Sequence, residues 1–221
     1  MKKALLSTVA LATLGIFVSC KNEASTATSE AQESVTSVDS TQSYKVDFEN
    51  SMVEWKGSKP TGVHTGVIKF SDATAQVVDG KLTGGKFVLD MNSITVTDLK
   101  AGDGKEDLES HLKGTGEKAS EDHFFNVNKY PKGSFEITKI TEENGKSMIT
   151  GNLTLKEISK SITVPATVTA EEGGMVLKSE PFMIDRTQWN INYASKSVFD
   201  DLKDKFVDDN VELIVILKIV K

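Results

Sequence analysis

A regular alternation of apolar and polar residues marks the stretch Ile149-Thr150-Gly151-Asn152-Leu153-Thr154-Leu155. Its odd positions are apolar or glycine, and its even positions are threonine or asparagine. Successive side chains of a β-strand point to opposite faces, so this period of two predicts a strand with one buried face. Asn144-Gly145 stands just before it, and this pair is typical of a two-residue hairpin turn. The turn predicts antiparallel pairing with the alternating residues 135–138.

The same alternation recurs along most of the chain after residue 43. Aromatic and β-branched residues, which favour strands, occupy one parity in segment after segment. Turn residues such as Asn50-Ser51 and Gly173-Gly174 separate these segments. The predicted strands cover residues 44–48, 53–55, 68–70, 86–91, 135–138, 149–155, 162–168, 175–184, 189–193 and 211–220.

Helical patterns are few. Leu108 and Leu112 are spaced i, i+4 and predict a short helix over residues 106–112. The sequence after Ser120 resembles a helix start, and residues 198–206 fit a helical turn or two. We therefore predict an all-β fold, a single antiparallel β domain with one or two short helices. Closure into a barrel is expected because it removes the exposed edges of a long meander.

The first residues have the pattern of a secretory signal peptide. Lys2 and Lys3 form a positive start, residues 4–18 are mostly apolar, and Ser19 precedes Cys20, the only cysteine. A cysteine at this point resembles a bacterial lipoprotein signal, in which residues 1–19 are removed and the Cys20 thiol is acylated. We therefore expect an exported, membrane-anchored lipoprotein of the bacterial cell envelope, on its periplasmic or outer-membrane face. The alternative is a soluble secreted protein in which Cys20 has no such role.

Charge and composition divide the rest of the chain. The formal net charge is −6, and loss of Lys2 and Lys3 would make it more negative, which argues against nucleic acid as a partner. Residues 21–43 are mostly Ser, Thr, Ala, Glu, Gln and Asp, a composition that cannot form a core. We expect residues 20–43 to be the lipidated cysteine and a flexible linker, and residues 44–221 to be the barrel domain.

The side chains that share the inward parity of the predicted strands are apolar. They include Trp55, Phe70, Phe87, Leu89, Met91, Phe135, Ile137, Leu153, Trp189 and Ile191. A barrel can fill its interior with such side chains or leave room for one small ligand, and the residues alone leave both readings open. The last strand is apolar on both faces over residues 211–217, which indicates burial under a helix or against a second subunit.

Other site chemistries have little support. The histidines His64, His111 and His123 lack the short ligand spacing of a metal helix, so we predict no metal site. The acidic residues between 200 and 209 lack the glycine and terminal glutamate of a calcium loop. No Gly-x-Ser-x-Gly motif supports a hydrolase, and we predict no catalytic residue. Asp185-Arg186 is interpreted as a charge-assisted structural lock that closes the barrel near a strand end.

Several motifs, in order, resemble the YceI-like family. They are Phe124-Phe125-Asn126-Val127-Asn128-Lys129-Tyr130-Pro131 with Ser134-Phe135, Gly151-Asn152-Leu153-Thr154-Leu155-Lys156 with Ile162-Thr163-Val164-Pro165, and Asp185-Arg186-Thr187-Gln188-Trp189. His64-Thr65-Gly66 and Asn92-Ser93-Ile94 also fit. The resemblance implies an extended lipocalin-like antiparallel β-barrel whose apolar tunnel holds a polyisoprenoid, with no established catalytic chemistry. It also implies export and, in some members, a homodimer.

The functional hypothesis is that the barrel binds a long-chain isoprenoid lipid, either a polyprenol or a prenylated quinone. It would act as an exported, membrane-anchored carrier or storage lipoprotein, with no cofactor beyond the non-covalent lipid. The ten inward residues given above are the predicted lipid-binding set, and Cys20 is the predicted lipidation site. The alternative is a surface or periplasmic interaction module with a filled barrel and no lipid ligand.

Overall fold

The computed structural model describes residues 25–33, 42–117 and 119–221. The predicted signal peptide, Cys20 and residues 34–41 of the predicted linker lie outside the described residues. The strands are β1 (Ser29–Glu30), β2 (Gln42–Val46), β3 (Met52–Lys59), β4 (Gly62–Val78), β5 (Lys81–Val96), β6 (Lys132–Glu143), β7 (Lys146–Leu155), β8 (Ile158–Glu171), β9 (Gly174–Ser179), β10 (Phe182–Asp185) and β11 (Asn210–Val220). The described helices are α1 (Lys105–Lys113) and the 3-10 helices η1 (Ala119–Glu121), η2 (Arg186–Trp189) and η3 (Lys203–Lys205).

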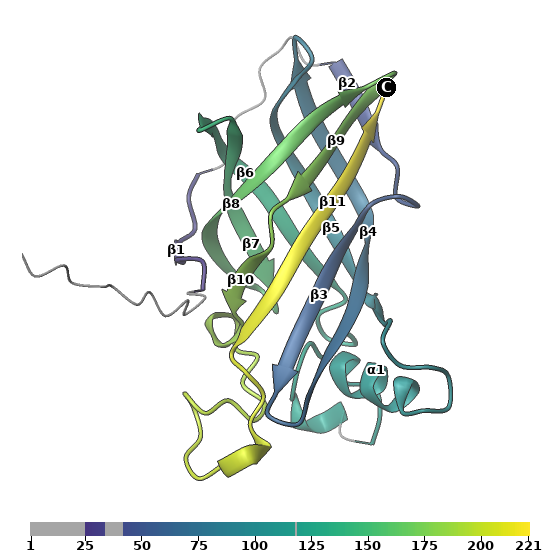
Figure 1. Ribbon diagram of the computed structural model, residues 1–221, viewed down its shortest axis with the longest axis vertical. Helices are drawn as coiled ribbons and strands as arrows, with labels where there is room; N and C mark the ends of the chain where they lie inside the picture. The colour runs from purple at the N-terminus through teal and green to yellow at the C-terminus, as the bar shows by residue number, and fades with distance from the viewer. Residues whose placement is uncertain (1–24, 34–41, 118) are drawn as a thin grey trace, which may run out of the picture.

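The strands form one antiparallel sheet that curls into a ring (Figure 1). Neighbouring strands run in the order β8-β7-β6-β5-β4, and β4 pairs with both β2 and β3. β11 closes the ring because it pairs with β2 and β3 on one side and with β9 and β10 on the other. β9 completes the circuit by pairing with β8. The predicted all-β barrel is therefore confirmed.

The wall of the barrel bends where its longest strands change register. β4 and β5 contain 17 and 16 residues, and their pairing shifts between Val67 and Lys69, between Phe70 and Asp72, and between Gln76 and Val77. A bulge of this kind adds a residue to one strand and increases its local twist. The shifts let two long strands follow the curvature that closure requires.

The hairpin predicted from Asn144-Gly145 is confirmed. Both residues have positive φ, 52° and 78°, as a type I′ turn requires, and they join β6 to β7. Glycine adopts such angles at no steric cost, and asparagine tolerates them better than most residues do.

Two predicted strands differ from the structure. Residues 175–184 form β9 and β10, separated at Glu180-Pro181. Residues 189–193 are not a strand, because η2 and a loop replace it. Asp185 accepts a hydrogen bond from the Thr187 amide at the start of η2, and Asn190 ends it with a φ of 60°. The apolar alternation of this segment reflects a turn whose side chains are also buried, so the strand prediction was wrong.

The predicted helix over residues 106–112 is confirmed as α1, which packs against β5. Residues 119–121 form only the short η1, and residues 198–206 contain only η3. None of the helices in the described ranges is long and apolar enough to cross a membrane. No helix among them packs against the outer face of β11, where Ile214 and Ile216 remain partly exposed.

The segment of residues 25–33 lies against the barrel, although the sequence predicted a flexible linker there. β1 pairs with the first half of β8, at Ser161 and Lys160, whereas β9 pairs only with the second half, from Ala166 onward. The side chain of Asn152 in β7 holds Gln32 through two backbone hydrogen bonds. This part of the linker therefore extends the wall of the barrel at the edge of β8.

Candidate functional site

The interior of the barrel contains two adjoining cavities. The larger has a volume of about 500 Å³, and the smaller has a volume of about 80 Å³. Val53, Leu89, Leu153 and Leu213 line both of them, so the two volumes meet at these residues. The side chains therefore do not fill the interior completely.

The smaller, inner cavity has almost entirely apolar walls. Aromatic side chains such as Phe70 and Phe87 line it and meet edge to face, with ring centroids 6.4 Å apart. Phe135 in β6 pairs with Phe87 in β5 and lies against Gly151 in β7, where a Cβ atom would come within 2.4 Å of the phenylalanine ring. Glycine at this inward position therefore makes room for the ring. The hydroxyl of Ser179, the polar group in this lining, accepts a hydrogen bond from the Val215 amide.

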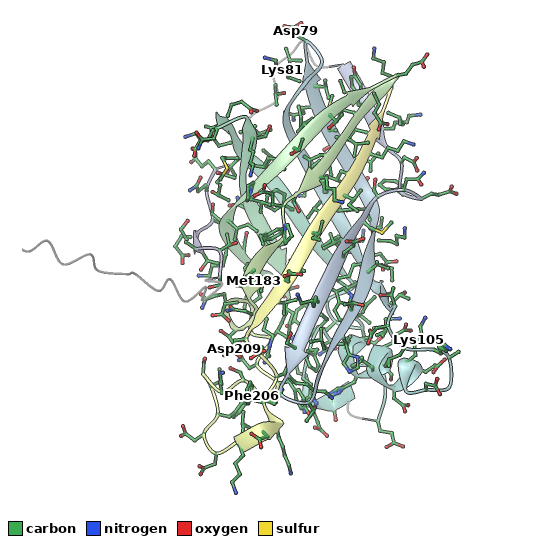
Figure 2. The ribbon with its side chains drawn as sticks, in the orientation of Figure 1. Asp79, Lys81, Lys105, Met183, Phe206 and Asp209 are labelled. Carbon is green, nitrogen blue, oxygen red and sulfur yellow. The ribbon has the colours of Figure 1, made fainter. Side chains whose placement is uncertain are left out.

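The larger cavity, which we call the mouth cavity, lies at the end of the barrel that carries α1 and η3. Lys105 and Phe206 mark this end in Figure 2, and Asp79 and Lys81 mark the opposite one. Its walls combine apolar strand residues with polar residues from the β3–β4 turn, α1 and the loop between η2 and β11. The polar side chains include Lys59, His64, His111, Arg186, Tyr193 and Lys205.

An aromatic and imidazole cluster forms part of the wall of the mouth cavity. His111 Nε2 lies 2.8 Å from His123 Nδ1, and His123 Nε2 lies 2.7 Å from a carboxylate oxygen of Glu121. The Tyr193 ring contacts both imidazoles, with centroids 4.8 Å and 4.2 Å away, and Phe124 packs against His111. The cluster joins α1 to the loop after η2, two segments that flank the mouth.

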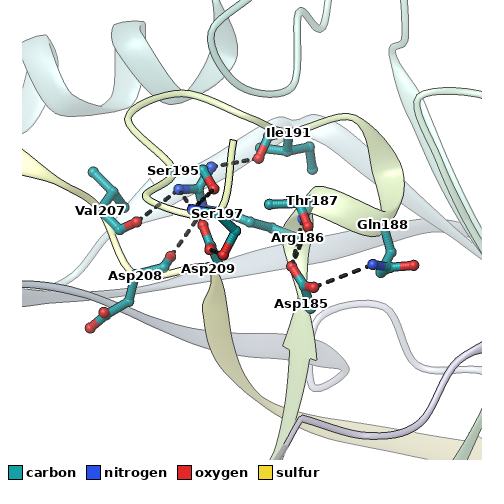
Figure 3. A network of polar contacts seen from close by, with 10 residues as sticks. All are labelled: Asp185, Arg186, Thr187, Gln188, Ile191, Ser195, Ser197, Val207, Asp208 and Asp209. Carbon is teal, nitrogen blue, oxygen red and sulfur yellow. Dashed lines mark hydrogen bonds and ion pairs between the residues drawn. The ribbon is translucent and has the colours of Figure 1, made fainter. Parts of the chain in front are cut away.

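Arg186 anchors the loop between η2 and β11. Its buried guanidinium donates hydrogen bonds to the carbonyl oxygens of Ile191, Val207 and Asp208 and forms an ion pair with Asp209 at 3.4 Å (Figure 3). Burial lowers the pKa of Arg186, whereas the negative charge of Asp209 opposes this shift. The buried guanidinium therefore bridges the two ends of the loop.

Asp185 has a separate role, although the sequence grouped it with Arg186 as one lock. Its carboxylate accepts hydrogen bonds from the amide and hydroxyl of Thr187, at 2.9 Å and 2.6 Å, and from the Gln188 amide group. Asp185 thus caps η2, and the ion pair that holds the loop is Arg186–Asp209.

The structure brings most of the predicted lipid-binding residues to these cavities. Phe70, Phe87, Phe135 and Ile137 line the inner cavity; Trp55, Met91 and Ile191 line the mouth cavity; Leu89 and Leu153 line both. Trp189 lines neither. It is fully buried in η2, and its indole nitrogen donates to the Leu153 carbonyl at 3.0 Å.

Sequence reasoning missed two groups of lining residues. Phe182 follows the break at Glu180-Pro181, so it lies at the opposite parity to Leu177 in the single strand predicted over residues 175–184. Leu213 lies on a strand that is apolar on both faces, so parity does not show which face points inward. His111 lies on a helix, where no strand periodicity places a side chain, and Lys59 is the polar last residue of β3. Among the described residues, no group of three His, Cys, Asp or Glu side chains is arranged to hold a metal ion.

Comparison with solved structures finds similar folds, among them the following two. Burkholderia cenocepacia BcnA is 22% identical with a TM-score of 0.61, and the match covers 80% of this chain and 100% of that one. A polyisoprenoid binding domain from Saccharophagus degradans, implicated in plant cell wall breakdown, is 12% identical with a TM-score of 0.56. That match covers 80% of this chain and 97% of that domain. No curated protein matches the chain.

A family model describes most of the chain. The YceI-like domain matches residues 44–219, which include every strand from β3 to β10 and nearly all of β11. The same range contains all the residues that line the two cavities. The chain therefore belongs to the YceI-like family.

Proposed function

We propose that this protein binds a long-chain isoprenoid lipid inside the barrel and carries or stores it outside the cytoplasm. The observation that carries the proposal is the pair of adjoining cavities, one apolar and one with a polar rim. An isoprenoid with a polar end likewise combines a long apolar chain with one polar group. The similar fold of a polyisoprenoid binding domain supports this class of ligand.

Binding would be driven by removal of the isoprenoid chain from water. Transfer of apolar surface into an apolar site contributes about 25 cal/mol per Å². The mouth cavity, at about 500 Å³, falls within the range of small-molecule sites, roughly 300–1,000 Å³. The tail would extend from the mouth cavity past Leu89 and Leu153 into the inner cavity.

The proposed role is that of a carrier, without catalysis. The buried guanidinium of Arg186 at the mouth is engaged in holding the structure, because it binds three carbonyl groups and Asp209. We further propose that Cys20 carries a lipid anchor and that the barrel faces the periplasm or the outside of an outer membrane. We also propose that two copies of the protein form a homodimer through the partly exposed outer face of β11.

Native mass spectrometry of the full protein, extracted gently from the cells that produce it, tests the proposal. We expect a second set of masses, heavier than the protein by an isoprenoid lipid, and loss of this increment after extraction with organic solvent. Delipidated protein should then take up a prenylated quinone or a polyprenol. A folded protein that carries no lipid and takes up neither compound would favour the interaction module.

A further inference from the structure

One polar atom inside the mouth cavity has no partner. The indole nitrogen of Trp55 is buried, and it makes no hydrogen bond among the described residues. One other buried side-chain atom in these ranges shares this condition, the Oδ1 of Asn192, but Asn192 does not line either cavity. An indole N–H can only donate, so the atom that would satisfy it must be an acceptor.

The position of this indole is fixed by its neighbours. Trp55 in β3 pairs across the sheet with Gly66 in β4. A Cβ atom at Gly66 would come within 2.3 Å of Trp55 Cζ2 and 2.5 Å of Cε2, so the ring lies directly against the glycine backbone. Glycine at this position creates the space for the indole. The unpartnered N–H therefore belongs to a ring seated in the wall of the mouth cavity.

The charges around the cavity indicate what kind of acceptor fits. Arg186 is the buried cation among the described lining residues, and its guanidinium is already bonded to the loop that it holds. Lys59 and Lys205 are exposed, and Asp204 lines the same rim. A buried anion beside Trp55 would therefore lack a free buried counter-charge, whereas an uncharged oxygen would need only the N–H.

We propose that the mouth cavity holds the polar end of the ligand, where an uncharged oxygen acceptor of that end accepts a hydrogen bond from Trp55 Nε1. The inference rests on the proposed isoprenoid function and narrows it to oxygenated, uncharged isoprenoids. A quinone carbonyl and a prenyl alcohol hydroxyl both offer this chemistry. A prenyl phosphate also has oxygen acceptors, but its negative charge would be buried without a free counter-charge. A pure hydrocarbon has no acceptor for the N–H.

The two tryptophans of the chain give a direct measurement with an internal control. The full protein, labelled with ¹⁵N at tryptophan, has two indole N–H signals. We expect that a prenylated quinone or a prenyl alcohol moves the Trp55 indole proton downfield on binding. The Trp189 signal should move little, because that N–H already donates to Leu153. The probe that gives the larger Trp55 indole shift and the lower Kd shows whether the site prefers a quinone carbonyl or an alcohol hydroxyl.

A substitution separates the hydrogen bond from the fit of the chain. Trp55→Phe retains a ring against Gly66 and removes the donor. We expect roughly three- to tenfold weaker binding of the oxygenated probes, the range of one hydrogen bond. An oxygen-free isoprenoid hydrocarbon of equal chain length should lose less affinity than the oxygenated probes, because it loses only the contact with the larger ring. Met91→Leu, in the same wall without a polar change, should affect the oxygenated probes and the hydrocarbon to the same extent.

The outcomes distinguish this inference from the proposed function. If the oxygenated probes bind but leave the Trp55 signal of the unsubstituted protein unmoved, the inference is overturned and isoprenoid binding stands. Tighter binding of a prenyl phosphate than of the alcohol would also overturn it. If none of the isoprenoids binds to the folded protein, the proposed function itself fails.

Discussion

The backbone amide of Thr26 donates a 2.7 Å hydrogen bond to the carbonyl oxygen of Met183 in β10. A few residues later β1 pairs with β8, so residues 26–30 connect two strands that are not paired with each other. We call residues 25–33 the N-terminal strap. It spans the seam in the barrel wall where β8 and β10 separate, on the outside of the strands whose inner faces carry Ile162 and Phe182.

Asn152→Ala should loosen this strap. The Asn152 side chain both accepts from the Gln32 amide, at 2.9 Å, and donates to the Gln32 carbonyl, at 2.6 Å. Loss of both hydrogen bonds should cost about 1–2 kcal/mol locally. We expect faster amide hydrogen exchange in residues 26–33, with little change in β4 and β5. Asn92→Ala is the control, because Asn92 is exposed and its side chain donates a hydrogen bond to the nearby Asp90 and not to the strap. Equal exchange in both variants would show that Asn152 does not hold the strap.

The strap was beyond prediction from the sequence for a physical reason. Ser29 and Glu30 carry no apolar alternation, and their pairing uses backbone groups and the side chains of Asn152 and Lys160. Sequence periodicity predicts which side chains are buried, so it cannot predict an exposed strand of two polar residues. The long strands were predictable because burial of one face requires the alternation that β7 displays.

The cavities were predictable only in part. Strand parity placed Phe70, Phe87 and Leu89 in the interior, and the structure agrees. Parity could not show that space remains between them, because that depends on the curvature of the closed sheet. The alternation of Trp189 and Ile191 was read as a strand, yet both side chains are buried by a capped turn. The prediction that these two side chains are buried was right, and the predicted strand conformation was wrong.

Arg186→Gln should destabilise the protein and release the loop at the mouth. Arg186 is the only arginine in the chain, and its planar fork reaches three carbonyl groups and Asp209 at once. Breaking a buried pair typically costs about 3–5 kcal/mol. We expect a loss of this order in urea unfolding, and Arg186→Lys should recover only part of it, since a single ammonium cannot reproduce the fork. Lys160→Ala, which removes a surface ion pair with the exposed Glu30, should cost far less, because exposed ion pairs contribute little to stability. If Arg186→Gln costs no more than Lys160→Ala, the guanidinium does not anchor the loop.

Glu157→Gly should stabilise the barrel. Lys156 and Glu157 form the turn between β7 and β8, and both have positive φ, 46° and 64°. Glu157 is exposed, so glycine there relieves backbone strain without loss of packing. We expect a gain of about 0.5–1 kcal/mol in the free energy of unfolding. Glu143→Gly, at the exposed last residue of β6, should instead lose stability, because glycine gives up more conformational freedom on folding and relieves no strain there. Destabilisation by both changes would contradict the strain at residue 157.

Cys20→Ala should release the protein from membranes. If Cys20 is the acylated residue, its replacement removes the covalent anchor and leaves the apolar export segment in place. We expect the unsubstituted protein in the membrane pellet after a salt wash and the variant in the soluble fraction. The barrel should remain folded by circular dichroism, since its described strands begin beyond residue 28. A variant that still pellets after the wash would rule out Cys20 as the anchor.

Leu89→Trp should obstruct the passage between the two cavities without unfolding the barrel. Leu89 lines both cavities, so a larger ring there can occupy existing space. Leu82 lies on the same strand and is equally buried, but it lines neither cavity. Leu82→Trp should therefore overpack the core at a cost of about 1–3 kcal/mol. We expect Leu89→Trp to lose binding of a prenylated quinone while its melting temperature changes little. A filled interior would make the two variants equally unstable, because neither site would then have room for the indole. The difference between these two melting temperatures thus measures whether the space beside Leu89 exists in solution.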